Sequence, residues 1–335
     1  MTALPACVGH GYGTTARHDR IDGRRVTASL LRTAAIIALV APAGVGAQQI
    51  TPDDDVPPAL CSALGDHFAT PLASPIDELR RIAEISGCAE ARSRLLRRAG
   101  FDERGAAPAG AFALRALPVS LLAVDRTAYP DDRNNGALWE GVGISTSLRP
   151  GLELSLPYLT VSLRPEILYQ QNRRFEMRDV ERVGYSEYAN PFYTDIDLPN
   201  RFGPDSWWDL AAGDSYARVD VGWFGAGLST ESLWRGPAVR YPIIMSNTAG
   251  GFPHVFLGAA RGVDVYVGDL QAELVWGRLS ESDYFDGKPA NDESRIINVA
   301  MALDLRWPEG LSLGGTRSYL YLSEDDDSDA MLTRI

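Results

Sequence analysis

Apolar and polar residues alternate in runs from about residue 110 onward. The clearest run is Ile297 to Trp307, where every second residue is apolar and the residues between them are mostly polar or small. Leu159–Tyr169 and Leu270–Trp276 alternate in the same way, and Val142–Leu148 does so before a predicted turn at Arg149-Pro150-Gly151. A period of two predicts strands with one apolar face and one polar face.

These runs are ~9–11 residues long, which is the length that a tilted strand needs to cross a lipid bilayer, whereas soluble strands more often have ~5–6 residues. Aromatic residues stand near the run ends, where outer-membrane barrels carry aromatic girdles: Tyr158, Tyr169, Trp223, Trp276 and Trp307. The sequence therefore predicts a mainly β fold, with an antiparallel transmembrane outer-membrane β-barrel over residues 106–335. A soluble sandwich or barrel also alternates and is the alternative.

Residues 48–105 have helical periodicity instead and are predicted to form a small periplasmic helical hairpin. The first helix follows Ser74-Pro75 and ends before Gly87, and the second covers Ala89–Ala99. Cys61 and Cys88 flank this hairpin. In an exported chain they are a natural disulfide pair, and neither has a further ligand at the spacing of a metal site.

Residues 1–47 are predicted to be a signal peptide. Arginines precede an apolar stretch that ends in small residues, and cleavage is expected after Ala47. The apolar part, Thr33 to Val45, is shorter than the ~20 residues of a membrane-spanning helix. We therefore expect export through a cleaved signal.

Composition and charge exclude several classes of function. The formal net charge of -12 argues against nucleic-acid binding, which needs a basic surface. There is no phosphate-binding loop, dinucleotide fingerprint or metalloprotease motif, and a serine-type triad would depend on His254 alone. We expect no enzyme, no cofactor and no metal, although a pair of carboxylates for glycoside hydrolysis stays open, because sequence does not give their separation.

A long loop rich in aromatic and acidic residues is predicted between about Asn172 and Gly213. It contains Trp207 and Trp208, whose indoles could stack on sugar rings while nearby carboxylates bind sugar hydroxyls. The alternative is that these aromatic side chains only pack the loop onto the barrel.

The segment from Gly225 to His254 contains many glycines and prolines and is predicted to be a shaped loop between strands. Its succession of Gly-Leu-Ser, Trp-x-Gly-Pro, Met-Ser-Asn and Gly-Phe-Pro-His resembles the signature of the capsule assembly proteins of the Wzi family. The resemblance extends from about Asn135 to Asp286. The residues that carry it in this loop are Glu231, Trp234, Arg235, Gly236, Pro237, Asn247, Pro253 and His254.

This resemblance implies an outer-membrane β-barrel with a small periplasmic helical part, which binds capsular or extracellular polysaccharide, aids capsule assembly or attachment, and is not an enzyme. Trp207, Trp208, Trp234 and Arg235 are the predicted polysaccharide-binding residues, on an outward surface. Arg235 would hold a sugar carboxylate; the alternatives are that it only braces its own loop or pairs with a lumen carboxylate such as Glu231. Because family barrels are larger, we expect the barrel to be incomplete in this chain. A porin or oligosaccharide channel and a secreted glycan-active enzyme are the alternatives.

Overall fold

The computed structural model describes residues 75–85, 95–98, 112–130, 135–193, 197–238, 241–259, 262–288, 292–308 and 310–322. The chain divides into two compact units, Met1–Asp54 and Asp55–Ile335, and all described residues belong to the second. The predicted signal peptide and the predicted disulfide pair, Cys61 and Cys88, lie outside the described residues.

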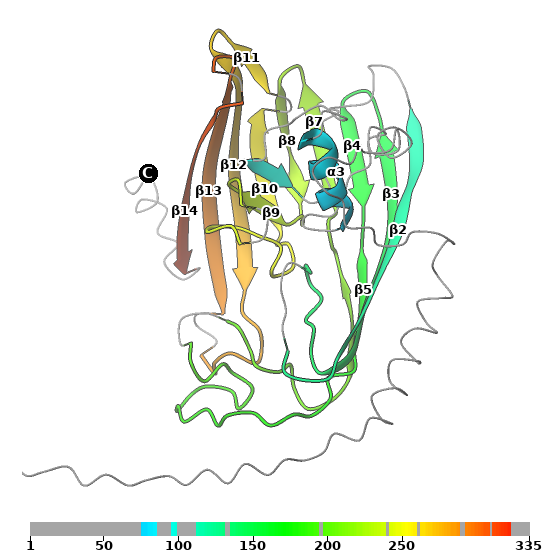
Figure 1. Ribbon diagram of the computed structural model, residues 1–335, viewed down its shortest axis with the longest axis vertical. Helices are drawn as coiled ribbons and strands as arrows, with labels where there is room; N and C mark the ends of the chain where they lie inside the picture. Colours follow the sequence, from blue (N-terminus) through cyan, green and yellow to red (C-terminus); the bar gives the residue numbers. More distant parts are fainter. Residues whose placement is uncertain are drawn as a thin grey trace, which may run out of the picture. The chain divides into compact units, whose positions relative to one another are not determined.

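The described chain is mainly antiparallel β-sheet, which confirms the predicted class. One 12-stranded sheet has the order β14-β13-β12-β10-β8-β7-β4-β3-β5-β6, with β2 beside β3 and β11 beside β12, and Figure 1 shows its long strands side by side. Its strands are β2 (Ala113–Arg126), β3 (Gly143–Ser155), β4 (Leu159–Leu163), β5 (Glu166–Gln170), β6 (Trp207–Ala211), β7 (Tyr216–Val221), β8 (Phe224–Ser229), β10 (His254–Ala259), β11 (Val263–Val265), β12 (Gly268–Ser280), β13 (Glu293–Leu305) and β14 (Ser312–Leu322).

Some short strands follow one another along the same line and together act as one longer, interrupted strand. β4 and β5 both pair with β3, and the break between them falls at Arg164-Pro165, where proline has no N–H to donate to the ladder. β7 pairs with β4 and β6 with β5, so these two also follow one line across the sheet. The chain therefore runs up and down through neighbouring strands. Among the described residues β2 pairs only with β3 and β14 only with β13, so these residues do not form a closed barrel.

The predicted turn at Arg149-Pro150-Gly151 is wrong, because β3 continues through it to Ser155. The register between β2 and β3 shifts between Leu117 and Ser120, opposite Pro150. Pro118 lies in that shift, so the two prolines, neither of which can donate a backbone hydrogen bond, face one another in a bulge. The bulge lets a proline occupy the middle of a long strand.

The two faces of the sheet differ in chemistry, and the apolar face is the exposed one. We call it the open face. One row of registered residues on it crosses nine strands and is apolar at every position: Leu114, Leu154, Val161, Ala217, Leu228, Val255, Trp276, Ile297 and Tyr319. Half of its large side chains are exposed, as Leu228 is to 62%, and of the others only Ile297 is buried.

The opposite face, which we call the covered face, carries buried polar side chains. One registered row on it contains Glu153, Ser162, Tyr216, Ser229 and His254, and the last four are buried. A soluble sheet with one solvated face buries its apolar side and exposes its polar side. The arrangement in this chain is the reverse, and the sequence pattern alone did not say which face would be covered.

The helix α3 (Pro75–Ile85) confirms the first predicted helix. The second predicted helix, Ala89–Ala99, is wrong over Leu96–Arg98, which form the strand β1. β1 pairs with β9 (Leu233–Arg235) in a separate two-stranded sheet. Backbone pairing with a segment more than a hundred residues away has overridden a local helical pattern. No helix among the described residues is long and apolar enough to cross a membrane.

The long connection after β5 and the connection between β12 and β13 lie together at one end of the sheet (Figure 1). The backbone N–H and the hydroxyl of Ser282 donate to Asp197 at 2.6 and 2.8 Å, and Tyr185 forms a bridge with Asp286. Rings from both connections also meet edge to face, as Tyr188 and Tyr284 do at 5.8 Å. The two loops therefore brace each other.

Candidate functional site

The two-stranded sheet of β1 and β9, which we call the ribbon, lies against the covered face. Leu233 of the ribbon forms a small apolar core with Phe256 and Val275 of the large sheet. The Arg97 guanidinium lies 4.9 Å from the centre of the Trp234 ring. The indole N–H of Trp234 donates to the carbonyl oxygen of Ala238 at 2.9 Å. Both apolar and polar side chains of the ribbon therefore have contacts that hold it in place.

A buried group of four charged residues joins the ribbon to the sheet, and we call it the charge cluster: Arg98, Glu231, Arg235 and Glu273. Arg98 Nη1 lies 3.3 Å from Glu231 Oε2, and Arg98 Nη2 contacts Glu273. Arg235 Nη2 lies 2.6 Å from the other oxygen of Glu273. The side chains of Glu231 and Arg235 are 1% exposed. Two positive and two negative charges therefore neutralise each other away from solvent.

Neutral side chains complete the hydrogen bonding around the charge cluster. Arg235 Nε donates to Asn298 Oδ1 at 3.1 Å, and the Asn298 amide donates to the hydroxyls of Thr316 and Ser318 at 2.9 Å. The Arg98 guanidinium lies 3.9 Å from the centre of the Phe256 ring, a cation–π distance. Together with the ion pairs to Glu273, these contacts tie the ribbon to β10, β12 and β13.

His254 lies at the edge of the charge cluster, with its two ring nitrogens in different surroundings. Nδ1 lies 2.7 Å from the carbonyl oxygen of Phe252, and Nε2 lies 3.5 Å from Arg98 Nη1. Because a carbonyl can only accept, the proton belongs on Nδ1, and Nε2 faces the guanidinium as an acceptor. This histidine is bound as a neutral ring and has no serine nucleophile among its hydrogen-bond partners in the described chain.

Burial weakens the basicity of both arginines without discharging them. Burial lowers the pKa of Arg98 to about 10, against the opposing effect of Glu231. Burial also lowers the pKa of Arg235 to about 9, and the positive charge of Arg98 adds to the shift. Both values lie well above neutral pH, so the ion pairs persist under physiological conditions.

The structure thus brings together Glu231, Trp234, Arg235 and His254, four residues of the predicted family-motif loop. Trp234 is fully buried and Arg235 is paired with Glu273, so the prediction that these two lie on an outward surface is wrong. A role for them in binding polymer stays a prediction, and it would require the ribbon to move. The remaining motif residues shape the connection: Gly236, with a φ of 96° that favours glycine, Pro237, Asn247 and Pro253.

Trp207 and Trp208 do not lie in a loop, as the sequence predicted, but in the strand β6. Trp207 is registered with Gln170 on the covered face, and Trp208 with Tyr169 on the open face. The Trp208 and Tyr169 rings are 4.7 Å apart, and Trp208 is 72% exposed. The two indoles point to opposite faces and cannot stack on the same sugar ring.

A cavity of about 240 Å³ lies beside the ribbon, and several polar side chains line it: Arg149, Glu166, Asp214, Thr230, Ser232 and Asn247. Glu166 accepts from Arg149 at 2.7 Å and from the Ser147 hydroxyl at 2.5 Å. Asp214 accepts from the backbone N–H of Ser232 at 3.3 Å. Glycines and alanines form much of the remaining wall, which leaves room between the polar groups. We call this the polar cavity.

Sequence reasoning missed three of the polar-cavity residues: Arg149, Glu166 and Asp214. Arg149 was assigned to a turn, whereas it lies inside β3. Glu166 could have been found, because it alternates with the apolar residues of its run and therefore belongs to the polar face. Asp214 lies in the bend between β6 and β7, for which the sequence carries no periodic signal.

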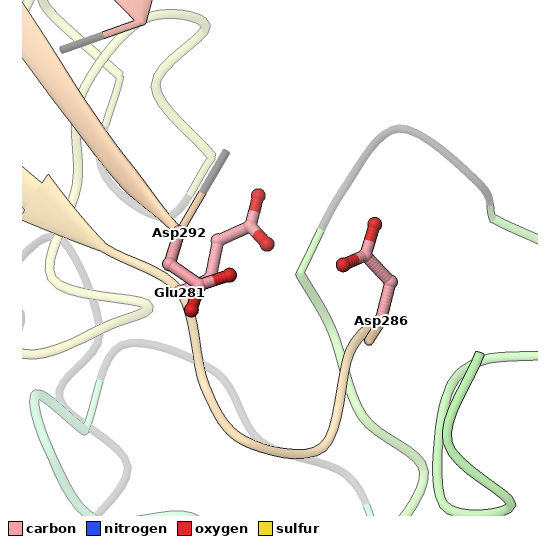
Figure 2. Close-up of side chains that lie close together, drawn as sticks. All are labelled: Glu281, Asp286 and Asp292. Atoms are coloured by element: carbon pink, nitrogen blue, oxygen red, sulfur yellow. The ribbon is translucent and has the colours of Figure 1, made fainter. Parts of the chain in front are cut away.

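Three carboxylates at the ends of β12 and β13 lie close enough to hold a cation. One oxygen each from Glu281, Asp286 and Asp292 lies within 4.8 Å of the others, and Figure 2 shows Asp286 reaching toward the other two from the connecting loop. Oxygen ligands of this kind suit calcium or magnesium. Asp286 also accepts from the backbone N–H of Lys288 at 2.8 Å, so it has a partner without any ion.

Comparison of the chain with models of known protein families, with curated proteins and with solved structures found no match.

Proposed function

We propose that the chain is an outer-membrane protein that binds capsular or extracellular polysaccharide and aids capsule assembly or attachment, without acting as an enzyme. The observation that carries the membrane part is that the apolar face of the sheet is exposed and the polar face is covered. An apolar row crosses nine strands on the open face, while polar side chains are buried on the covered face. Exposed apolar bands with polar interiors are typical of transmembrane barrels.

Strand length supports the same proposal. β2 has 14 residues, and β3, β12 and β13 have 13 each. A tilted transmembrane strand needs ~9–11 residues, and most strands in soluble domains are shorter. Trp276 of β12 and Tyr319 of β14 lie in the same registered row, with one strand between them, as the aromatic residues of a girdle would.

The polysaccharide part of the proposal is supported by the resemblance of the Gly225–His254 segment to the Wzi family and by the polar cavity that this segment helps to line. Thr230, Ser232 and Asn247 come from that segment, while Arg149 comes from β3 and Asp214 from the bend between β6 and β7. Hydroxyl, amide and carboxylate groups around a small space are the groups that bind sugar hydroxyls. The ribbon held across the covered face makes an open diffusion channel the weaker alternative.

One observation favours glycan hydrolysis as a second candidate function. Two carboxylates, Glu166 and Asp214, line the polar cavity. Glycosidases use two carboxyl groups, one of them protonated to act as the general acid. Glu166 is ion-paired with Arg149 and accepts from the Ser147 hydroxyl, so these two contacts already hold its carboxylate, which suits binding better than catalysis. We place hydrolysis second.

The test compares Asp214→Asn with Asp209→Asn, which changes an exposed carboxylate outside the polar cavity in neighbouring β6. Both proteins should fractionate with outer membranes and show heat-modifiable mobility on a gel. Asp214→Asn should retain several-fold less polysaccharide on cells, and Asp209→Asn should retain the normal amount. Equal retention would contradict the polar cavity as the site. Recovery of the wild type in a soluble fraction would contradict the membrane part, and release of sugar fragments by purified protein would favour the enzyme.

A further inference from the structure

Three side chains that line the polar cavity have hydrogen-bonding groups that the described chain leaves unused. Ser232 is 4% exposed, and its hydroxyl has no hydrogen-bond partner among the described residues. Asp214 accepts through Oδ1 from the backbone N–H of Ser232, and its Oδ2 has no partner in the same part of the chain. Arg149 donates through Nε and Nη2, which leaves Nη1 without a described acceptor. Because buried polar groups are normally hydrogen-bonded, unused groups around one cavity point to a ligand.

These groups come from three separate segments that hold one another in place. Arg149 lies in β3, Asp214 in the bend between β6 and β7, and Ser232 just before the ribbon strand β9. The Thr230 hydroxyl donates to the carbonyl oxygen of Gly213 at 2.7 Å, which ties the bend to the segment that carries Ser232. The unused groups are therefore fixed around the space before any ligand enters.

The charges around the polar cavity are balanced. Arg149 and Glu166 both line it and form an ion pair at 2.7 Å. Asp214 adds a second carboxyl to the wall, and Arg164, which lies near enough to act on its charge, does not line the cavity. Two arginines and two carboxyls leave no excess positive charge for an anionic ligand.

A carboxylate on the ligand would be bound poorly in this wall. Arg149 could offer it Nη1 alone, since Nη2 and Nε already have acceptors, whereas arginine binds a carboxylate best through two parallel hydrogen bonds. The ligand would also meet Glu166 and Asp214, and carboxyl groups that share a small site resist being ionised together. The cavity therefore disfavours an acid.

An uncharged sugar ring matches the polar cavity in both size and hydrogen bonding. Its volume of about 240 Å³ is below the ~300–1,000 Å³ of sites for drug-sized ligands, so it suits one sugar residue and not a longer stretch of polymer. A sugar hydroxyl can donate and accept. One hydroxyl can therefore donate to Asp214 Oδ2, while another accepts from Arg149 Nη1.

We infer that the polar cavity binds a single uncharged sugar residue and discriminates against the corresponding uronic acid. The inference rests on the proposed function and names the class of sugar that its site takes. It differs from the expectation that Arg235 holds a sugar carboxylate, because Arg235 is already paired with Glu273.

The test measures the binding of methyl glycosides to the full chain in detergent by saturation-transfer NMR with competitive titration. The glycosides form pairs that differ only at the last carbon, which is a hydroxymethyl group in one member and a carboxylate in the other: glucoside and glucuronide, galactoside and galacturonide, mannoside and mannuronide. The wild type should bind the neutral member of at least one pair roughly tenfold more tightly than its acid. The control Asp209→Asn, which changes an exposed carboxylate outside the polar cavity, should keep this ratio.

Two cavity variants should change the ratio in different ways, with heat-modifiable mobility as the check that each one folds. Glu166→Gln removes the charge that balances Arg149, so the uronate should bind several-fold more tightly than it does to the wild type. Asp214→Asn removes a carboxylate acceptor and should weaken binding of the neutral sugar several-fold.

A wild type that binds a uronate more tightly than its neutral counterpart would overturn the inference and leave the proposed function standing. The same holds if the uronate gains nothing in a folded Glu166→Gln protein. Glycosides that bind equally to the wild type and to Asp214→Asn, or that do not bind at all, would overturn both the inference and the polar cavity as the sugar site.

Discussion

Removing the guanidinium of Arg98 should destabilise the fold more than any change to an exposed arginine. Arg98→Met keeps a long apolar side chain in place but takes away the partner that Glu231 and Glu273 share. Glu273 would still contact Arg235 at 2.6 Å, whereas Glu231 would stay buried, 1% exposed, without its ion pair to Arg98.

The expected cost follows from these contacts. Breaking a buried ion pair by removing one partner typically costs ~3–5 kcal/mol, because the other charge is left uncompensated. The contact with the Phe256 ring at 3.9 Å is also lost. We therefore expect a loss of about 3–5 kcal/mol in the free energy of unfolding. Arg306→Met, which breaks an exposed pair with Asp264, should cost only ~0.2–1 kcal/mol.

The assay is urea-induced unfolding of protein in detergent or lipid vesicles, followed by tryptophan fluorescence. The double variant Arg98→Met/Glu231→Gln and the single variant Glu231→Gln complete a double-mutant cycle, since Glu231→Gln removes the negative charge that Arg98 no longer balances. The cost of the double variant should be below the sum of the two single variants by about 1–3 kcal/mol. If Arg98→Met costs no more than Arg306→Met, or if the two single changes simply add, the charge cluster does not hold the ribbon in place.

Three further predictions concern other parts of the chain. Gly227→Val should destabilise the protein by about 1–3 kcal/mol in the same assay, because a Cβ there would lie 2.2 Å from a carbonyl oxygen of the neighbouring strand. Mass spectrometry of exported protein should find Cys61 and Cys88 joined, and two free thiols would contradict the predicted disulfide. Trp208→Ala should lower the free energy of unfolding by ~0.5–1.5 kcal/mol, because its ring contact with Tyr169 is lost, and should leave polysaccharide retention normal. Reduced retention in Trp208→Ala but not in Trp207→Ala would instead indicate that the exposed indole binds sugar.

Strand positions could be predicted where the alternation is long and regular. The run from Ile297 to Trp307 corresponds to β13, Glu293–Leu305, and Leu270–Trp276 lies inside β12. An alternating run does not say which of its two faces will be covered, because that depends on what packs against the sheet. The burial of Asn298 and the exposure of Met301 are therefore information that only the structure supplies.

The charge cluster could not be predicted, because its members are far apart in the chain. Arg98 lies 133 residues before Glu231, and Arg235 lies 38 residues before Glu273. The loop residues form a motif in the sequence, but nothing local shows that Trp234 lies in a strand that pairs with β1 and is buried. The same pairing explains why Leu96–Arg98 are not helical, since a three-residue strand has no periodicity of its own to detect.

The central claim, that the open face lies in lipid, is tested most directly by spin labels along β13. In a chain whose three cysteines have been replaced, single cysteines would be placed in turn at five successive positions and labelled: Val299, Ala300, Met301, Ala302 and Leu303. In vesicles, the labels at Val299, Met301 and Leu303 should contact dissolved oxygen and be protected from a water-soluble nickel reagent, and the two alanine positions should be shielded from lipid. Labels at Val299 and Met301 that react freely with the nickel reagent would contradict the claim.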